Sequence, residues 1–380
     1  MGLVLEMGAR ALQLGIPLSV QIDLTFRCNE RCIHCYLDHE DHGEMSTAEI
    51  KDLLDQLAAA GVFFLNLSGG EIFMRKDLFE IIEHARKLQF AVKLKTNAVM
   101  IRAAKAKRIA ELSVESVQIS LYSHKPEVHD EITKLPGSFK RTMEGARLLK
   151  AEGVKVTFAN VLMTNNADDY PGVQALAAEL DIGYSVDATI TPMMDGDRSI
   201  LELNVDADRL KNIFHDPTLL GGTAETFCAL PTGPVQEADA FSTLPCSAGH
   251  TACYVSPYGE VYPCVQFPYL VGNIREQRFI DIWKNSPQLQ EVRAITLGDV
   301  QGCSSCVHGG SCSRCPGLAY LEGNMRGPSI QDCEKSFART GVPSQNLLRK
   351  RAEAEAKELA IPVIDNGSGR AGIPLMLVVE

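Results

Sequence analysis

The arrangement of the cysteines constrains this chain more than any other feature of its sequence. Twelve cysteines occur among 380 residues, and all but Cys228 fall into two widely separated groups. A cytosolic chain of this size neither keeps nor needs so many disulfides, whereas clustered cysteines in a reducing compartment bind metals or act as catalytic thiols. The pattern predicts two metal-bearing regions. The first holds Cys28, Cys32 and Cys35, and the second holds Cys246, Cys253, Cys264, Cys303, Cys306, Cys312, Cys315 and Cys333.

The amino-terminal residues and the net charge bear on where such a chain works. Glu6 and Arg10 interrupt the first apolar run too early for the core of a signal peptide, and no stretch approaches the length of a membrane span. We therefore expect a cytoplasmic protein without a membrane partner. The net charge is −11, which disfavours approach to a phosphate backbone, so we expect no nucleic-acid partner.

Short apolar segments alternate with helix-length segments through the first half of the chain. Each apolar segment is rich in Val, Ile, Leu or Phe and is bounded by polar residues or glycine, as strands are. Ser46 and Glu49 form a capping box at the start of a helix predicted over 46–60, and further helices are predicted over 77–87 and 138–152. Six βα units in sequence imply a parallel sheet, either doubly wound or curled into a barrel. The predicted strands are residues 19–24, 63–68, 91–96, 116–121, 155–162 and 184–190.

The texture of the sequence changes near residue 231, where Gly, Pro, Cys and Ser become frequent and helical periodicity fades. Such a composition is typical of a small domain held together by metal. Within it we expect helices over 279–284 and 287–293, and a solvated helix with alternating charges follows over 346–360. The expected division is an N-terminal segment over 1–17, a barrel over 18–230, a cysteine-rich domain over 231–340 and a C-terminal helix and tail over 341–380.

The first cysteine group places three thiolates on one loop that follows the first predicted strand. Three thiolates are one ligand short of a closed tetrahedral zinc site or of a fully ligated [4Fe–4S] cube. His34 would complete a structural zinc site, although its position between Cys32 and Cys35 makes simultaneous ligation sterically awkward. The other interpretation is an iron–sulfur cube with one iron left open to an outside molecule. This Cys-x3-Cys-x2-Cys loop resembles that of the radical S-adenosylmethionine (radical SAM) superfamily.

The loops after the later strands extend this resemblance. Leu67-Ser68-Gly69-Gly70-Glu71 is similar to the methionine-binding motif of the superfamily. Paired glycines let a backbone approach a ligand closely, and a carboxylate accepts hydrogen bonds from an ammonium group. The resemblance implies a partial (β/α)6 barrel whose first cluster is a [4Fe–4S] cluster that binds S-adenosyl-L-methionine (SAM). The cofactor contacts that it implies are Gly69, Gly70, Glu71, Thr96, Ser120 and Asn160.

The second cysteine group has enough thiols for two four-ligand sites. Two structural zinc ions are one interpretation, although zinc ribbons usually separate their cysteine pairs by a longer loop than this chain has between Cys306 and Cys312. The pattern is similar to that of the SPASM domain, which carries auxiliary clusters in many radical SAM enzymes. The chain departs from that pattern at Cys312 and Cys315, which are separated by two residues instead of three, and this leaves an open iron on the first auxiliary cluster as an alternative.

The resemblance also implies a ligand set for each auxiliary [4Fe–4S] cluster. The first cluster would be held by Cys246, Cys253, Cys264 and Cys315, and the second by Cys303, Cys306, Cys312 and Cys333. Cys228 fits neither set, and we interpret it as a structural thiol.

The function that the resemblance implies is radical oxidation. The SAM-bound cluster, supplied with an electron by an external donor such as flavodoxin or ferredoxin, would yield a 5′-deoxyadenosyl radical that removes hydrogen from an unactivated position. Two auxiliary clusters provide places for a surplus electron, so we favour an oxidoreductase that crosslinks a ribosomally made peptide or protein. About eighteen residues precede the first predicted strand, too few for a leader-binding domain, so we expect a separate leader-peptide carrier or another way of docking.

Several alternatives stay open at this point. The sulfatase-maturing interpretation loses its base, because Val265 and not Asp follows Cys264. A tetrapyrrole-modifying relative would pair propionates with cations, for which the candidates are Lys93, Lys95 and Arg198. A non-enzymatic iron–sulfur carrier would not need the Gly69–Glu71 motif, and a zinc-stabilised binding protein is the third possibility. No spacing argument selects a catalytic acid among Asp187, Asp195 and Asp197.

Overall fold

A curved sheet organises the part of the chain that the computed structural model describes, which is residues 2–219, 228, 244–308, 312 and 314–359. Its strands follow the order β6-β5-β4-β3-β2-β1-β7-β8-β9. All neighbouring strands from β6 through β1 to β7 in this order pair in parallel. The pairs β7–β8 and β8–β9 are antiparallel. The strands are β1 (Ser19–Asp23), β2 (Phe64–Ser68), β3 (Ala91–Thr96), β4 (Ser116–Ser120), β5 (Val156–Val161), β6 (Gly183–Asp187), β7 (Ala252–Val255), β8 (Glu260–Tyr262) and β9 (Gly272–Asn273).

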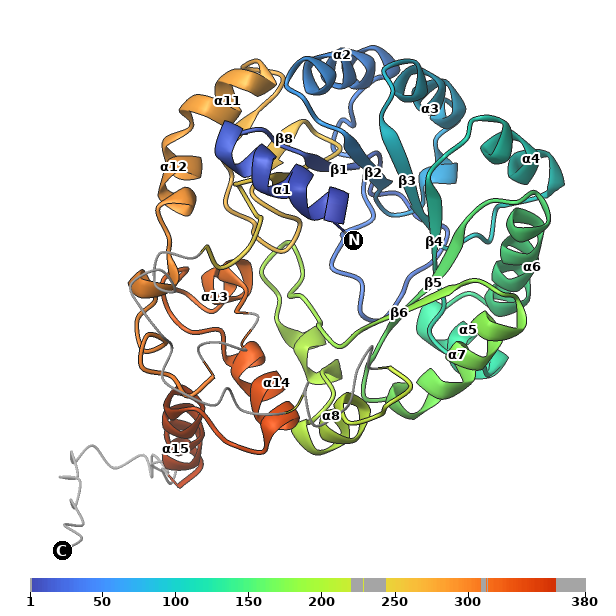
Figure 1. Ribbon diagram of the computed structural model, residues 1–380. Coiled ribbons are helices and arrows are strands. Elements are labelled where there is room, and N and C mark those ends of the chain that lie inside the picture. The colour runs from blue at the N-terminus through green and yellow to red at the C-terminus, as the bar shows by residue number, and fades with distance from the viewer. Residues whose placement is uncertain (1, 220–227, 229–243, 309–311, 313, 360–380) are drawn as a thin grey trace, which may run out of the picture.

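Helices cover the outer side of this sheet, as Figure 1 shows for α2, α3, α4 and α6. The strands β1 to β6 therefore curl into the partial α/β barrel that the sequence predicts. The helices are α1 (Gly2–Leu14), α2 (Thr47–Ala59), α3 (Leu78–Lys87), α4 (Ala103–Glu111), α5 (Pro126–Thr133), α6 (Ser138–Ala151), α7 (Tyr170–Glu179), α8 (Ala207–Phe214), α11 (Phe279–Asn285), α12 (Pro287–Arg293), α13 (Pro316–Leu321), α14 (Ile330–Thr340) and α15 (Gln345–Leu359). Short 3-10 turns occur at η1 (Ile72–Met74), η2 (Ala167–Asp169), η3 (Ser199–Leu203) and η4 (Leu297–Asp299).

The start of α2 shows the predicted capping box. The Ser46 hydroxyl accepts from the backbone N–H of Glu49 at 3.3 Å, and the Glu49 carboxylate accepts from the backbone N–H of Ser46 at 2.7 Å. Two donors that the helix cannot satisfy internally are thereby bonded. This fixes where α2 begins.

The barrel strands have two different faces. Val92 and Leu94 of β3 are fully buried in the main hydrophobic core, whereas Lys93 and Lys95, which alternate with them, are only partly buried. Successive side chains of a strand point to opposite faces of the sheet, so the apolar set packs under the helices and the polar set faces the inside of the barrel. The interior is therefore polar, as the cavity described below requires.

The cysteine-rich region continues the barrel sheet instead of standing apart from it. β7 pairs in parallel with β1, with Ala252 beside Ser19, and β8 and β9 extend the same sheet. Farther along, α14 packs against α8. The division at residue 231 that we expected from composition therefore does not mark a break in the sheet. Among the helices of the described residues, none has the length and apolarity to cross a membrane.

Candidate functional site

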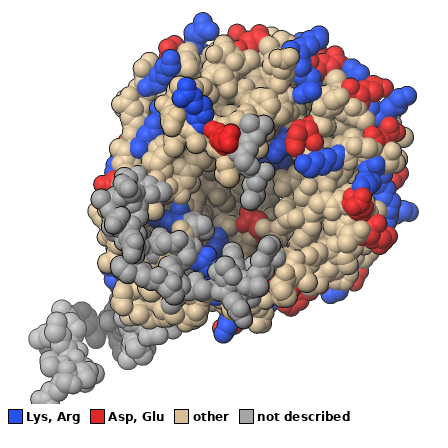
Figure 2. All heavy atoms as spheres, in the orientation of Figure 1, with Lys and Arg blue, Asp and Glu red and all other residues tan. Residues whose placement is uncertain are grey.

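A cavity of about 510 Å³ lies at the carboxyl ends of the barrel strands. The face of the molecule drawn in Figure 2 is hollowed near its centre. In a parallel barrel, loops from several strands meet at this end, which is where catalytic groups gather. Sequence-predicted residues that line the cavity are Cys28, Cys32, Cys35, Gly69, Gly70, Thr96, Ser120 and Asn160.

The three thiols of the first group share one wall of the cavity. The Cys28 Sγ accepts from the backbone N–H of Glu30 at 3.4 Å, and the Cys32 Sγ lies 3.6 Å from Glu30 Oε2 and 4.0 Å from the Tyr122 hydroxyl. Burial raises the pKa of the Cys28 thiol to about 12 and also raises the pKa values of Cys32 and Cys35. These thiols stay protonated at neutral pH until a bound cation displaces their protons.

This donor set fits an iron–sulfur cluster. Soft thiolates are the ligands of such clusters, and three of them on one loop leave one iron free for a further ligand in the shared cavity. No three His, Cys, Asp or Glu side chains of the described ranges are grouped closely enough to hold a single metal ion. Burial lowers the pKa of His34 to about 4, and its ring lies against that of Tyr122 with the centroids 4.8 Å apart.

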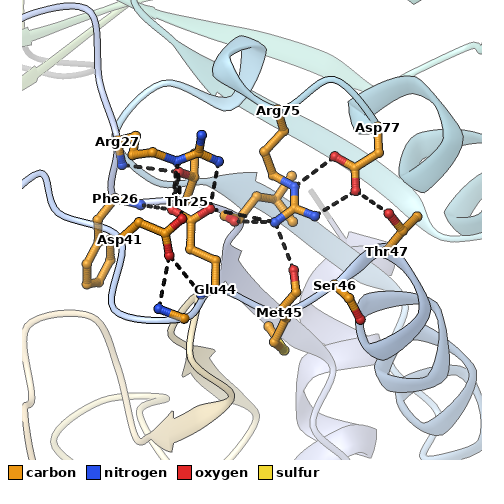
Figure 3. Close-up of polar contacts among 12 residues, drawn as sticks. Thr25, Phe26, Arg27, Asp41, Glu44, Met45, Ser46, Thr47, Arg75 and Asp77 are labelled. Atoms are coloured by element: carbon orange, nitrogen blue, oxygen red, sulfur yellow. Dashed lines mark hydrogen bonds and ion pairs between the residues drawn. The ribbon is translucent and has the colours of Figure 1, made fainter.

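The segment that leads into the cysteine loop is anchored by Glu44 (Figure 3). The Glu44 carboxylate accepts from the Thr25 hydroxyl, from the backbone N–H of Phe26 at 3.2 Å and from Arg27 Nη2 at 2.8 Å. Arg75 also stabilises this region, because its Nη1 donates to the backbone carbonyl of Met45, next to Glu44, at 3.0 Å. These bonds are largely withdrawn from water and therefore fix where the chain enters the loop.

Arg75 itself is held from the other side, as Figure 3 also shows. Its Nη2 lies 2.6 Å from the Asp77 carboxylate, which also accepts from the Thr47 hydroxyl at 2.6 Å. The loop after β2, the start of α2 and the cysteine loop are thus joined through one guanidinium. A planar cation with several donors is suited to such a junction.

Gly69 and Gly70 are needed for a reason different from the one we predicted. A Cβ atom at Gly69 would lie 2.2 Å from the Thr25 carbonyl oxygen, and one at Gly70 would lie 2.5 Å from the Arg27 carbonyl oxygen. Gly69 also has φ +136°, which side chains rarely allow. Both glycines line the cavity, but the close approach that excludes a side chain is to the backbone before Cys28.

Glu71 does not line the cavity. Its carboxylate is fully buried and accepts from the backbone N–H of Phe73 at 3.0 Å, from Thr96 Oγ1 at 2.8 Å and from the backbone N–H of Asn97 at 2.8 Å. Burial raises the pKa of Glu71, and these hydrogen bonds oppose the shift. The carboxylate that we expected to accept from an ammonium group instead holds the loop after β2 to the loop after β3.

Asn160 reaches the cavity with its amide already bonded. Its Nδ2 donates to the carbonyls of Leu121 and Tyr122 at 3.0 and 3.1 Å, and its Oδ1 accepts from the Tyr184 hydroxyl at 3.1 Å. These bonds fix the orientation of Asn160 at the cavity wall and hold the loop after β4. Ser120 lies on the same wall.

Several cavity residues were not among the predicted contacts. Strand alternation signals Gln21 and Gln118, because every second residue of a strand faces inward, whereas the residues that lie in loops carry no such pattern. Asn97 follows Thr96 directly, and its Nδ2 donates to Asn29 Oδ1 at 2.9 Å beside Cys28. These additional lining residues include Gln21, Glu30, Tyr36, Asn97, Gln118, Tyr122 and Gln266.

Three cysteines of the second group come together at one place. Cys246 and Cys264 each accept at 3.4 Å from the backbone N–H two residues later, and Cys315 accepts from Leu318 N at 3.5 Å. Burial is the main cause that raises the pKa values of all three thiols, and Cys315 raises those of Cys246 and Cys264 further. Cys28 accepts in the same way. Amide donors aimed at sulfur are one means by which a protein tunes an iron–sulfur cluster.

Cys253 lies away from those three thiols. It is on β7 beside Val20 of β1 and belongs to the main hydrophobic core under the helices. The next residue, Tyr254, points into the barrel, where its hydroxyl donates to Asp23 at 3.0 Å. Burial raises the pKa of Cys253 to about 12, and the charge of Arg293 opposes the shift. Strand alternation turns Cys253 to the opposite face of the sheet, so the structure does not bring it together with the three thiols that the resemblance groups it with.

The other four cysteines of the second group form a separate cluster of thiols. Burial raises the pKa of Cys333 to about 12, and the thiols of Cys303, Cys306 and Cys312 raise it further. Burial likewise raises the pKa of Cys303 to about 11. The Asn346 amide lies 4.0 Å from the Cys303 Sγ. These four thiols are therefore close enough to influence one another's protonation.

Of the remaining predicted residues, few reach the cavity. Lys95 and Asp187 line it. Lys93 instead lies 3.7 Å from Glu115, and Arg198 donates to the Leu321 carbonyl at 2.6 Å. The Cys228 Sγ lies 3.5 Å from the Phe214 carbonyl, which agrees with a structural thiol. Asp195 and Asp197 are exposed and cap turns of their own loop.

Two family descriptions match the chain. The radical SAM superfamily matches residues 22–173, and SPASM, an iron–sulfur cluster-binding domain, matches residues 246–316. These ranges contain the first cysteine loop and most of the second cysteine group, respectively.

The chain is also similar to characterised proteins over most of its length. It is 30% identical to the mycofactocin maturase MftC of Mycobacterium ulcerans, covering 94% of this chain and 95% of that protein. It is 30% identical to the PqqA peptide cyclase of Xanthomonas oryzae pv. oryzae, with coverages of 90% and 92%. The AdoMet-dependent heme synthase of Methanosarcina barkeri is 28% identical, with coverages of 80% and 92%.

Among solved structures, the fold resembles that of Streptococcus suis SuiB bound to its precursor peptide SuiA. The TM-score is 0.68 at 18% identity, and the match covers 86% of this chain and 79% of SuiB. Together with the parallel barrel sheet, this likeness establishes the fold class.

Proposed function

Because the chain belongs to the radical SAM superfamily and carries a SPASM domain, we propose that it oxidatively crosslinks a ribosomally made peptide or small protein. The observation that carries this proposal is a single cavity. In it, the thiols of Cys28, Cys32 and Cys35 face the glycines of the loop after β2 and the polar ends of β3 to β5. One cavity thus offers both the cluster ligands and the surroundings of a nucleoside-bearing ligand.

The cofactors follow from the two domains. The radical SAM domain binds a [4Fe–4S] cluster and SAM, and the SPASM domain binds auxiliary iron–sulfur clusters. Together the first cluster and SAM supply a 5′-deoxyadenosyl radical, and that chemistry belongs to the cofactors. We assign the first cluster to Cys28, Cys32 and Cys35. The contacts that we assign to SAM are Gly69, Gly70, Thr96, Ser120 and Asn160, with Glu71 holding their loops together.

The protein itself positions the loops that hold the cofactors, shields the reactive intermediate and tunes the charge of the cavity. Glu44 and Arg75 fix the entry of the cysteine loop, and Glu71 fixes the loops opposite it. Burial keeps Glu30 beside the first cysteines predominantly protonated near neutral pH, since its pKa is raised to about 8. A cavity with few free charges protects a reactive intermediate from side reactions.

We assign the first auxiliary cluster to Cys246, Cys264 and Cys315, which leaves one iron without a cysteine ligand. Gln266 donates to the Cys264 Sγ and also lines the main cavity, so this thiol set lies beside the substrate space. The second auxiliary cluster is assigned to Cys303, Cys306, Cys312 and Cys333. Two clusters at the end of the barrel support a net oxidation, which leaves a surplus electron to be accepted.

The peptide substrate is supported by the nature of the relatives. One is named a peptide cyclase and another a maturase, and both align over nine-tenths of the chain. We further propose that flavodoxin or ferredoxin supplies the electron and that a separate carrier delivers the leader of the peptide. Because a heme synthase is among the relatives, a tetrapyrrole is the second candidate for the substrate of this chain. Against it, only Lys95 of the three proposed propionate partners lines the cavity.

The proposal is tested first by SAM cleavage. Anaerobically reconstituted and reduced protein is expected to release 5′-deoxyadenosine, whereas the Cys28→Ala/Cys32→Ala/Cys35→Ala variant is not. Cys253→Ala is the matched control, because it removes a cysteine that we place outside every cluster. Absence of 5′-deoxyadenosine from protein with full iron would exclude the enzyme interpretation in favour of an iron–sulfur carrier.

The substrate is tested by mass spectrometry after co-expression with a peptide encoded beside the gene. Loss of two hydrogens per crosslink is the expected result. Loss of carbon dioxide from an added iron porphyrin, with the peptide unchanged, would show that the substrate is a tetrapyrrole and not a peptide.

A further inference from the structure

A buried arginine lies at the junction between the two auxiliary thiol sets. Arg314 follows Cys312 of the second set by two residues and directly precedes Cys315 of the first. Its side chain is 5% exposed. Two of its nitrogens are bonded to the backbone, with Nε donating to the Gly327 carbonyl at 2.8 Å and Nη2 donating to the Met325 carbonyl.

The third nitrogen of Arg314 has no such bond. Nη1 is buried and has no hydrogen-bond partner among the described residues. The groups whose charges act most on Arg314 are Cys303, Cys315, Asp332 and Cys246, in that order. Three of these four are thiols that we assign to the auxiliary clusters. The remaining one, Asp332, accepts from the backbone N–H of Cys315 at 2.7 Å and forms its ion pair with Lys335 at 3.7 Å.

Burying a guanidinium without an anionic partner is costly, so an unpaired cation in this position calls for a negative group. The cysteine ligands of an iron–sulfur cluster are thiolates, so each auxiliary cluster with its ligands would be anionic. Net charge and hydrogen bonds to sulfur are two of the factors that set the reduction potential of such a cluster.

We propose that Arg314 is a positioning residue that stabilises negative charge on both auxiliary clusters and thereby raises their reduction potentials. Its charge lies between the two thiol sets, and Nη1 is the donor left for a sulfur ligand. Arg314 also occupies the two-residue spacer between Cys312 and Cys315, so the shortened spacing brings the cation to the junction. This inference rests on the proposed function, because it requires both auxiliary clusters to be present.

The chain offers a matched control for this residue. Arg293 also donates to two carbonyls, those of Gly249 and Trp283, both at 2.7 Å, and it leaves one buried nitrogen without a partner among the described residues. The thiol beside it is Cys253, which we place outside both sets. Arg293→Gln therefore removes a partly buried cation that is bonded to the backbone in the same way, without removing charge from a cluster site.

The experiment is a redox titration of the reconstituted full-length protein, followed by electron paramagnetic resonance, with iron and sulfide counted per chain. Arg314→Gln is expected to retain its iron and to shift the auxiliary potentials to more negative values. Arg314→Lys keeps the charge and is expected to restore most of the wild-type potentials, and Arg293→Gln is expected to leave them unchanged. Loss of auxiliary iron from Arg314→Gln but not from Arg314→Lys would equally support the role of the charge.

Two results would overturn the inference. One is Arg314→Gln with full iron and unshifted auxiliary potentials. The other is an equal change in Arg314→Lys and Arg314→Gln, which would assign Arg314 a purely structural role in holding the Met325 and Gly327 carbonyls. Wild-type protein with only about four irons per chain would overturn the auxiliary-cluster assignment itself, and the inference with it.

Discussion

The carboxylate of Glu71 accepts a hydrogen bond of 2.8 Å from the backbone N–H of Asn97, which ties the loop after β2 to the loop after β3. Asn97 continues the connection, since its side chain donates to Asn29 Oδ1 at 2.9 Å, next to Cys28. The three loops that line one side of the cavity are therefore one hydrogen-bonded unit. A change in any of them is expected to affect both SAM binding and retention of the cluster.

Glu71→Ala is expected to lower the free energy of unfolding by about 2 kcal/mol, because it leaves buried donors of Thr96 and Asn97 without their acceptor. It is also expected to weaken SAM binding, which equilibrium dialysis on reconstituted protein would measure. Glu80→Ala is the control, because Glu80 is an exposed partner of Lys51 and its loss should change stability by less than about 0.5 kcal/mol. Equal effects of the two substitutions would contradict the role of Glu71.

Gly69→Ala is expected to prevent the loop after β2 from closing against the backbone at Thr25, since the added Cβ atom would lie 2.2 Å from that carbonyl oxygen. We expect loss of the first cluster, read as about four fewer irons per chain. Gly8→Ala is the matched control, because a Cβ atom at Gly8 in α1 would meet nothing within 4 Å and alanine favours a helix. Full iron in Gly69→Ala protein would refute this account of the motif.

The strands of the barrel were predictable because their apolar residues recur over short segments between polar boundaries. The prediction for 91–96 matches β3, and the other five barrel strands begin and end within three residues of the predicted limits. β7, β8 and β9 were missed. Residues 252–255 read Ala-Cys-Tyr-Val inside a cysteine-rich region, and what makes them a strand is pairing with β1, which no local pattern reveals.

Site residues could be predicted from the sequence where the residue type alone decides their chemistry. They could not be predicted where their role depends on the direction in which the side chain points. Cys28, Cys32 and Cys35 share a loop, so their spacing suffices to bring them together. Cys253 has the right residue type in a suitable spacing, but the sheet turns it away from the cavity. The sequence gives no indication of the role of Arg314, because that role depends on the two thiol sets that only the fold brings close to it.

Cys253→Ala is expected to keep the full iron content and the spectra of all clusters, because the thiol belongs to the hydrophobic core on the helix side of the sheet. The cavity left by a small buried side chain should lower the free energy of unfolding by about 1 kcal/mol. Cys246→Ala is the comparison, and it is expected to lose up to about four irons per chain. Loss of iron from Cys253→Ala would return Cys253 to the ligand set.

Asp23 gives the stability of the metal-free chain a dependence on pH. Burial raises the pKa of Asp23 from 3.8 to about 6, and hydrogen bonds from Tyr254 and Gln21 oppose the shift. Because the folded chain holds this proton more tightly than the unfolded chain, the stabilisation is present below about pH 4 and is lost as the pH rises through 6. The loss amounts to roughly 3 kcal/mol for a shift of this size.

Asp23→Asn removes the titrating group while keeping an acceptor for the Tyr254 hydroxyl. Denaturant unfolding of the two metal-free proteins between about pH 4 and about pH 7 would give their difference in free energy of unfolding, from which the titrations common to both cancel. We expect the wild type to lose stability relative to Asp23→Asn across this range, with most of the change below the pKa of about 6. A constant difference would show that Asp23 keeps its ordinary pKa and lies in contact with water, contrary to its complete burial at the end of β1.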